Sequence, residues 1–190
     1  MNLRDQYIEG ARITRDVYER NPVIRVRGMY RTARQGSIND WLGRRLWTVL
    51  EPLHEVVRTD AVPRDQRDYD DLVVDYALAI QESLLPLKRG GFGIGQKLVN
   101  LYMKDQWALR RLPEGVEPLL HAPLDRPVLS KLASVPRTWA AWSKVEAQGP
   151  AAQEVVDYLA IQRRFREYCQ QPDTPFASTI ELEQFIWTRI

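Results

Sequence analysis

The sequence predicts an all-α protein of about eight helices. Apolar residues recur at three- and four-residue spacing through most of the long segments. Most prolines and the glycine cluster over 90–95 fall between those segments, and only residues 23–27 alternate in the manner of a strand. The 190 residues are 44% hydrophobic, which is enough chain for one core. We therefore expect a single compact helical unit over residues 1–190.

The first half of the chain predicts two helices. Residues 3–20 are charged and amphipathic, and this helix should end at Asn21 and Pro22. Ser37 is a candidate N-cap, with Asp40 three residues further on. The helix behind Ser37 carries apolar residues on one face as far as Leu53, and Pro52 should kink or end it. Residues 59–68 are a polar connection.

The second half predicts the remaining helices. Residues 72–84 have the clearest helical period, and Pro86 should end that helix. A glycine-rich turn over 88–95 precedes a helix over 96–109, and a proline-rich loop then runs over 112–123. Asp125 is the expected cap of the next helix. Helices over 138–147, 151–169 and 178–190 complete the set, the last of them beginning with Ser178 and Glu181 at capping-box spacing.

Composition excludes several classes of protein. The single cysteine, Cys169, excludes an intrachain disulfide, a cysteine-based zinc site and a four-cysteine iron–sulfur cluster. No run approaches the roughly 18 apolar residues of a membrane helix, and the N-terminus has no apolar signal-peptide core. We therefore expect a soluble cytoplasmic protein with no membrane partner.

The formal net charge of +2 conceals two basic segments. Residues 11–45 hold nine arginines against three acidic residues, and residues 88–111 hold six basic residues against one aspartate. Solvated helix faces can also be charged in this way. Two such segments, one of them at a glycine-rich turn, favour a polyanionic partner such as DNA.

The glycine-rich turn is a candidate phosphate-binding device. Residues 88–95 hold four of the ten glycines, and glycines between helices let the backbone approach a phosphate beside the positive end of a helix dipole. An ordinary turn between helices would also use glycine. The predicted DNA contacts are Lys88, Arg89, Gly91, Gly93, Gly95 and Gln96.

Lys97 and Asp125 are the candidate catalytic residues. Lys97 should lie in the first turn of the helix after the glycines, where the dipole disfavours an ammonium and favours the neutral, nucleophilic amine. Asp125 is a helix cap by pattern. A carboxylate beside a deoxyribose would also stabilise the positive charge that forms as a glycosidic bond breaks.

These residues carry a resemblance to a known family. The segment 92–100, Phe-Gly-Ile-Gly-Gln-Lys-Leu-Val-Asn, resembles the hairpin and catalytic-lysine segment of the helix-hairpin-helix DNA glycosylases. The segment 121–129 resembles the aspartate motif that follows it in that family. The resemblance covers roughly residues 70–135 and is nearest in type to the compact, lysine-bearing 8-oxoguanine glycosylases. It implies that Lys97 forms a Schiff base, that Asp125 is the catalytic aspartate, and that Gly93 and Gly95 are hairpin glycines.

The resemblance implies an enzyme that excises a damaged or modified base from double-stranded DNA after flipping it out, with possible abasic-site lyase activity. It implies no cofactor and no metal, no obligate protein partner, and a nucleoid location in a bacterium or archaeon. The candidate base-pocket residues are Trp107, His121, Trp139, Trp142, Gln184 and Trp187. The alternatives are a defence enzyme that acts on hypermodified phage bases, a non-catalytic helix-hairpin-helix DNA-binding protein, and a helical interaction domain.

Overall fold

The computed structural model describes residues 2–11, 45–85, 91–125, 128–129 and 149–188. This part of the chain is all-helical, as predicted, and it contains no strand. Its α-helices are α1 (Leu3–Ala11), α5 (Leu46–Arg58), α6 (Gln66–Leu84), α7 (Phe92–Ala108), α9 (Gln153–Cys169) and α10 (Thr179–Trp187), and a short 3₁₀ helix, η2, spans Glu117–Leu119. No helix in these ranges is long and apolar enough to cross a membrane.

Several predicted features lie outside the described residues. They are the helix boundary at Asn21 and Pro22, the cap at Ser37, the helix over 138–147, and the arginine-rich segment over 12–44. Lys88, Arg89, Trp139 and Trp142 lie outside them as well.

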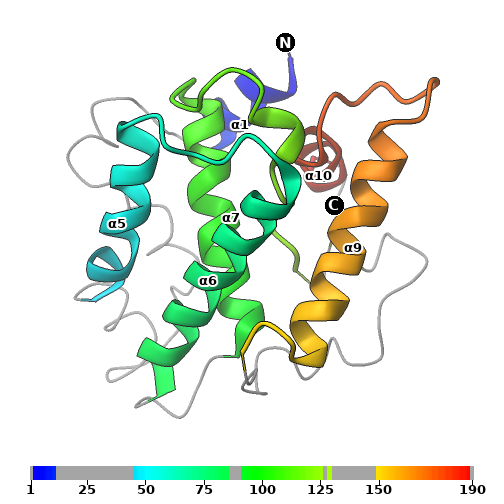
Figure 1. Ribbon diagram of the computed structural model, residues 1–190. Helices are drawn as coiled ribbons and strands as arrows, with labels where there is room; N and C mark the ends of the chain where they lie inside the picture. The colour runs from blue at the N-terminus through cyan, green and yellow to red at the C-terminus, as the bar shows by residue number, and fades with distance from the viewer. Residues whose placement is uncertain (1, 12–44, 86–90, 126–127, 130–148, 189–190) are drawn as a thin grey trace.

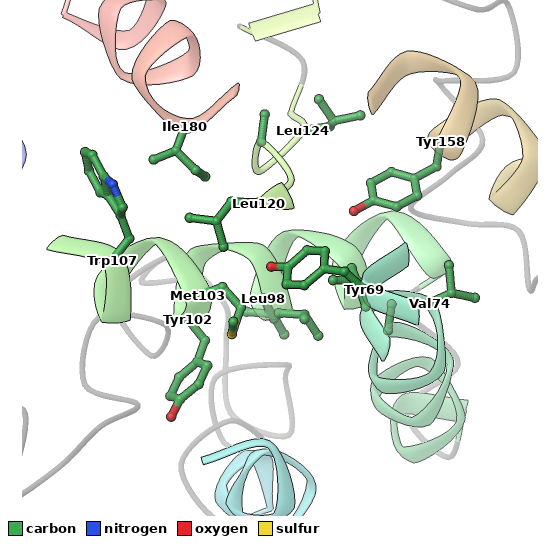
Figure 2. Packing of buried hydrophobic residues seen from close by; sticks show 14 of the residues in the cluster. Tyr69, Val74, Leu98, Tyr102, Met103, Trp107, Leu120, Leu124, Tyr158 and Ile180 are labelled. Carbon is green, nitrogen blue, oxygen red and sulfur yellow. The ribbon is translucent and has the colours of Figure 1, made fainter. Parts of the chain in front are cut away.

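Helix α7 is the centre of the fold. It runs through the middle of the molecule, with α5 on one side and α9 on the other (Figure 1). Leu98, Tyr102 and Met103 of α7 are fully buried and belong to one core cluster. In Figure 2 they lie on one side of α7 and Leu120 lies on the other, so core side chains surround the helix. Burial of this kind is the main favourable term in folding. Side chains that α7 presents are therefore held on a deeply buried helix.

A glycine sets the distance between α6 and α7. A Cβ built on Gly95 would lie 2.1 Å from the backbone oxygen of Ala77 in α6. Backbone cannot move aside as a flexible side chain can, so only glycine allows these two helices to pack this closely. Gly95 therefore serves helix packing within α7 and is not part of a turn.

We expect Gly95→Ala to destabilise the protein by about 3 kcal/mol or more, because the added methyl group forces the two central helices apart. The helix propensity of alanine, about 1 kcal/mol better than that of glycine, offsets only part of this cost. Gly10→Ala in α1 is the matched control, because among the described residues outside its own stretch of helix nothing lies within 4 Å of a Cβ at that position. Urea unfolding of both variants checks the prediction, and equal stability of the two would contradict it.

Two predicted boundaries were wrong. Pro52 does not end its helix, since α5 continues to Arg58 with Pro52 inside it. Leu50, Leu53 and Val57 are buried on both sides of the proline, and this packing outweighs the loss of one backbone hydrogen bond. Helix α6 begins within the predicted connection, because Asp65 is its N-cap and accepts a hydrogen bond from the Asp68 amide at 3.0 Å.

Other boundaries agree with the sequence. Helix α6 is capped by Leu85, directly before Pro86. Ser178 caps α10 by accepting from the Glu181 amide at 3.4 Å. Glu181 returns a bond by accepting from the Ala177 amide at 2.8 Å, one residue earlier than in the standard capping box.

Candidate active site

The two candidate catalytic residues meet in space. Lys97 Nζ donates a hydrogen bond to Asp125 Oδ2 at 2.9 Å, although 28 residues separate them. The Asp125 side chain is 11% exposed and the Lys97 side chain is 28% exposed. The pair is therefore partly desolvated but still reachable from solvent.

Helix α7 positions Lys97 in a way the sequence did not predict. The helix begins at Phe92, with Gly91 as its N-cap, so Gly93 and Gly95 are helical and Lys97 is the sixth helical residue. The expectation that Lys97 lies in the first turn, where the dipole repels a cation, was wrong. Glycines usually interrupt a helix, but here burial of Phe92 and Ile94 on both sides of Gly93 extends α7 backwards.

Two glutamine side chains hold the segment that leads to Asp125. Gln96 donates to the Leu124 carbonyl at 2.7 Å, and its amide oxygen accepts from the Leu124 amide at 3.3 Å. Gln162 of α9 bonds both backbone groups of Ala122 in the same way, at 2.8 and 3.0 Å. A buried extended segment must satisfy its backbone groups, and these side chains do so at alternate residues. Asp125 thus follows a segment fixed from two helices.

Asp125 is also a helix cap, as predicted. Its Oδ1 accepts from the Val128 amide at 3.1 Å, while its Oδ2 accepts from Lys97. One carboxylate oxygen is therefore occupied by the backbone, and the other faces the amine.

The ion pair lines a cavity of about 600 Å³. Among the described residues, α1 contributes Gln6, Tyr7, Gly10 and Ala11 to its walls, and α7 contributes Lys97, Leu101 and Lys104. The remaining wall comes from Pro123, Asp125 and the C-terminal residues Glu183, Gln184, Trp187 and Thr188. The volume is within the range of small-molecule sites, about 300–1,000 Å³. The predicted base-pocket residues Gln184 and Trp187 thus share one cavity with Lys97 and Asp125.

A second, deeper ion pair lines the same cavity. Lys104 of α7 bonds Glu183 of α10, and the two side chains are only 3% and 2% exposed. Burial raises the pKa of the Glu183 carboxyl above its ordinary value, and nearby Asp125 adds to this rise, whereas the neighbouring Lys104 opposes it. Lys104 also lies 4.3 Å over the ring of Tyr7, whose hydroxyl donates to Asp105 at 2.5 Å.

His121 stabilises the fold and does not line the cavity. It is 1% exposed, and its ring nitrogens lie 2.6 Å from the Tyr158 hydroxyl and 2.7 Å from Asp70 Oδ1. Asn100 donates to the same hydroxyl at 2.8 Å. The prediction that His121 lines a base pocket was wrong, because this network ties its ring between α6 and α9.

Stability should fall as the pH falls through the range where the unfolded chain gains a proton at histidine. Burial lowers the pKa of His121 below its ordinary value of 6.5, although Asp70 opposes the shift. The unfolded chain therefore takes up a proton below about pH 6.5 while the folded chain stays neutral, which favours unfolding by up to about 1.4 kcal/mol per pH unit. Burial lowers the pKa of His54 as well.

Urea unfolding between about pH 7.5 and about pH 5.5 measures this slope. His121→Gln should be less stable at every pH in this range and should have a shallower slope. An unchanged slope in that variant would contradict the assignment to His121.

Burial corrects four further predictions. Gln96 is fully buried and Gly95 packs against α6, so neither can contact DNA. Gly91 is a buried N-cap, and of the three predicted glycines only Gly93 keeps partial exposure. Trp107 is 2% exposed and packs in the core beneath Arg4, whose guanidinium lies 4.5 Å from its ring centroid. Lys104, which belongs to the basic segment over 88–111, is also unable to contact a phosphate, because its charged group is buried.

Sequence reasoning missed Lys104, Glu183 and the residues of α1. A signal for Lys104 was present, because Lys97, Leu101 and Lys104 follow at i, i+4 and i+7 and so share one face of a helix. No local pattern links α1 to this face, since that contact joins residues about 90 positions apart.

We found no match to the chain among protein-family models, curated proteins or solved structures. The described residues contain no group of three or more His, Cys, Asp or Glu side chains that could hold a metal ion.

Proposed function

We propose that the protein is a DNA glycosylase that excises a damaged or modified base at the Lys97–Asp125 cavity. One observation carries the proposal: an amine and a carboxylate far apart in the sequence form a 2.9 Å pair on the wall of a cavity large enough for a base. The motif resemblance points to the same two residues. The arginine-rich segment over 11–45 supports a DNA partner.

The geometry supports separate roles for Lys97 and Asp125. A proton from Lys97 Nζ first passes along the hydrogen bond to Asp125, which leaves a neutral amine with a free lone pair. That amine attacks the sugar C1′ and forms a C–N bond while the bond from C1′ to the base breaks, and the electron pair of that bond leaves with the base, which takes up the proton from Asp125. The carboxylate that forms as Asp125 gives up this proton stabilises the positive charge that develops on the sugar. Sugar-ring opening then gives a Schiff base, and loss of a 2′ proton expels the 3′ phosphate.

Defined duplexes test the proposal. Each duplex carries one guanine, 8-oxoguanine, uracil, 5-hydroxymethylcytosine or glucosylated 5-hydroxymethylcytosine at its centre, and alkali reveals abasic sites. We expect alkali-labile sites at one or more of the modified bases, with affinity that falls as salt is raised. Salt-sensitive binding without abasic sites at any base would favour the non-catalytic DNA-binding alternative.

A second candidate is a glycosylase that acts on bulky, hypermodified bases of phage DNA. The size of the cavity favours it, because about 600 Å³ exceeds what an unmodified planar base occupies and fits a drug-sized group. Gly10 widens this wall, since in the described part of the chain no atom beyond its own stretch of α1 lies within 4 Å of the place a Cβ would take.

Gly10→Leu should separate the two candidates. A leucine in the cavity wall removes room without contacting the core, so release of a glucosylated base should fall about tenfold or more while release of a small base changes little. The alkali assay on the two duplexes gives this ratio, with Gly10→Ala as the control. Equal loss at both bases would contradict a bulky-base pocket.

A further inference from the structure

All the hydrogen-bonding positions of the Gln96 amide are filled. Its Nε2 donates to the Gly93 carbonyl at 2.9 Å and to the Leu124 carbonyl at 2.7 Å. Its Oε1 accepts from the Leu124 amide at 3.3 Å and from Asn100 Nδ2 at 3.2 Å. A side-chain amide offers two donor hydrogens and two acceptor lone pairs, so this amide is saturated.

These bonds determine the orientation of the amide. The Leu124 amide can only donate, so the Gln96 atom that it reaches is the oxygen, and the two carbonyls can only accept, so the atom that they reach is the nitrogen. Gly93 and Asn100 lie three residues before and four residues after Gln96 on α7, which places all three on one face of the helix. The amide is therefore fixed to α7 on both sides of its contact with Leu124.

The residues that Gln96 joins stand directly before the two members of the ion pair. Gln96 precedes Lys97 in the chain, and Leu124 precedes Asp125. The Gln96 side chain is fully buried, so water cannot replace its bonds to both backbone groups of Leu124. The backbone positions of Lys97 and Asp125 cannot move apart without breaking these bonds.

Gln162 provides a comparison within the same structure. It makes the same two bonds to the backbone of Ala122, and it is equally buried. Satisfaction of a buried backbone accounts for Gln162, which lies on α9 and bonds a residue three positions before Asp125. Gln96 makes its bonds from the helix that carries Lys97, and it therefore links the two members of the pair.

We propose that Gln96 is a positioning residue that holds Lys97 and Asp125 in contact. Transfer of the proton from Nζ to the carboxylate needs the 2.9 Å hydrogen bond between them. A displacement of about 1 Å at reacting groups can cost about 100-fold in rate. The effect on base release rests on the proposed function, whereas the contact itself can be measured without DNA.

The first test compares the contact in Gln96→Met and Gln162→Met. Methionine has a similar volume and no amide, so the unfolding midpoint should fall in both variants. A carbodiimide couples a carboxylate to an amine in direct contact, with the reagent taking up the water that is lost, and mass spectrometry of tryptic peptides measures the Lys97–Asp125 amide. The yield should fall about fivefold or more in Gln96→Met and stay within about twofold of wild type in Gln162→Met, where Gln96 still holds Leu124.

The second test measures single-turnover base release with excess protein, which reports the chemical step apart from binding. On the duplex from which wild type releases base fastest, Gln96→Met should be about 100-fold slower with unchanged DNA affinity, and Gln162→Met should stay within about threefold of wild type. Gln96→Met added to Asp125→Asn should slow that variant no more than a few-fold, because a positioning residue acts through the group that it positions. Gln96→Asn keeps an amide on a side chain too short to reach Leu124, and it should lose both rate and cross-link.

The outcomes separate this inference from the proposed function. If wild type releases no base but the cross-link falls in the Gln96 variants and not in Gln162→Met, the proposed function fails and the positioning role stands. If both Gln96 variants keep the cross-link within about twofold of wild type, the positioning role is overturned and Gln96 stabilises the fold alone. An equal loss of rate in Gln96→Met and Gln162→Met would also overturn it, because it would follow from the loss of stability that the two variants share.

Discussion

The Asp125→Asn variant should release base about 10²–10³ times more slowly than wild type. Asparagine removes the negative charge that faces Lys97 and the developing charge on the sugar, and losses of this size follow removal of one electrostatic group. Asparagine is also a good N-cap, so its side-chain oxygen can still accept from the Val128 amide. Single-turnover base release, measured with the alkali assay, gives the ratio of the two rates.

A second substitution separates the capping role of Asp125 from its catalytic role. Asp125→Ala loses the cap as well, and it should cost about 1 kcal/mol of stability beyond the effect of asparagine. If Asp125 were only a cap, the asparagine variant would keep the wild-type rate and the alanine variant would lose stability alone. That pattern would contradict a catalytic role for Asp125.

The Lys97→Met variant should lose all covalent trapping on DNA. Borohydride reduces a Schiff base to a stable amine, so trapping requires a primary amine at the sugar carbon. Methionine has a similar length and no amine. Denaturing gel electrophoresis of the protein with the preferred duplex and borohydride should show a shifted band for wild type and none for the variant.

Lys97→Arg is the control for charge. Arginine keeps a cation beside Asp125 but forms no Schiff base, so it should keep DNA binding and lose the adduct. An adduct that persists in both variants would assign the nucleophile to another lysine. Base release that persists without an adduct would limit Lys97 to charge stabilisation and make the enzyme monofunctional.

The sequence predicted the helices best where the pattern is local. The period of α6 and the cap at Ser178 were readable because apolar spacing and capping depend on residues within one turn. The start of α7 was not readable. Glycines suggest a turn, and only the burial of Phe92 and Ile94 together with the close packing of Gly95 against Ala77 in α6 explains why they are helical.

The candidate site shows the same difference between features set by local sequence patterns and features set by long-range contacts. Lys97 and Asp125 were found from short motifs, but the other contacts of the cavity and of the segment before Asp125 join residues far apart in the sequence. Gln162 bonds Ala122 from 40 residues away, and Glu183 reaches Lys104 from 79. No spacing rule connects such pairs, so burial and hydrogen bonding had to be seen before their roles could be assigned.

A double-variant comparison is the most direct test that Lys97 and Asp125 act as one unit on one nucleotide. It measures single-turnover base release by wild type, Lys97→Met, Asp125→Asn and the double variant on the preferred duplex. Residues that act as a unit are not additive, so the double variant should be no more than a few-fold slower than the slower single variant. Losses that multiply, or a wild-type protein that releases no base, would contradict a shared catalytic site.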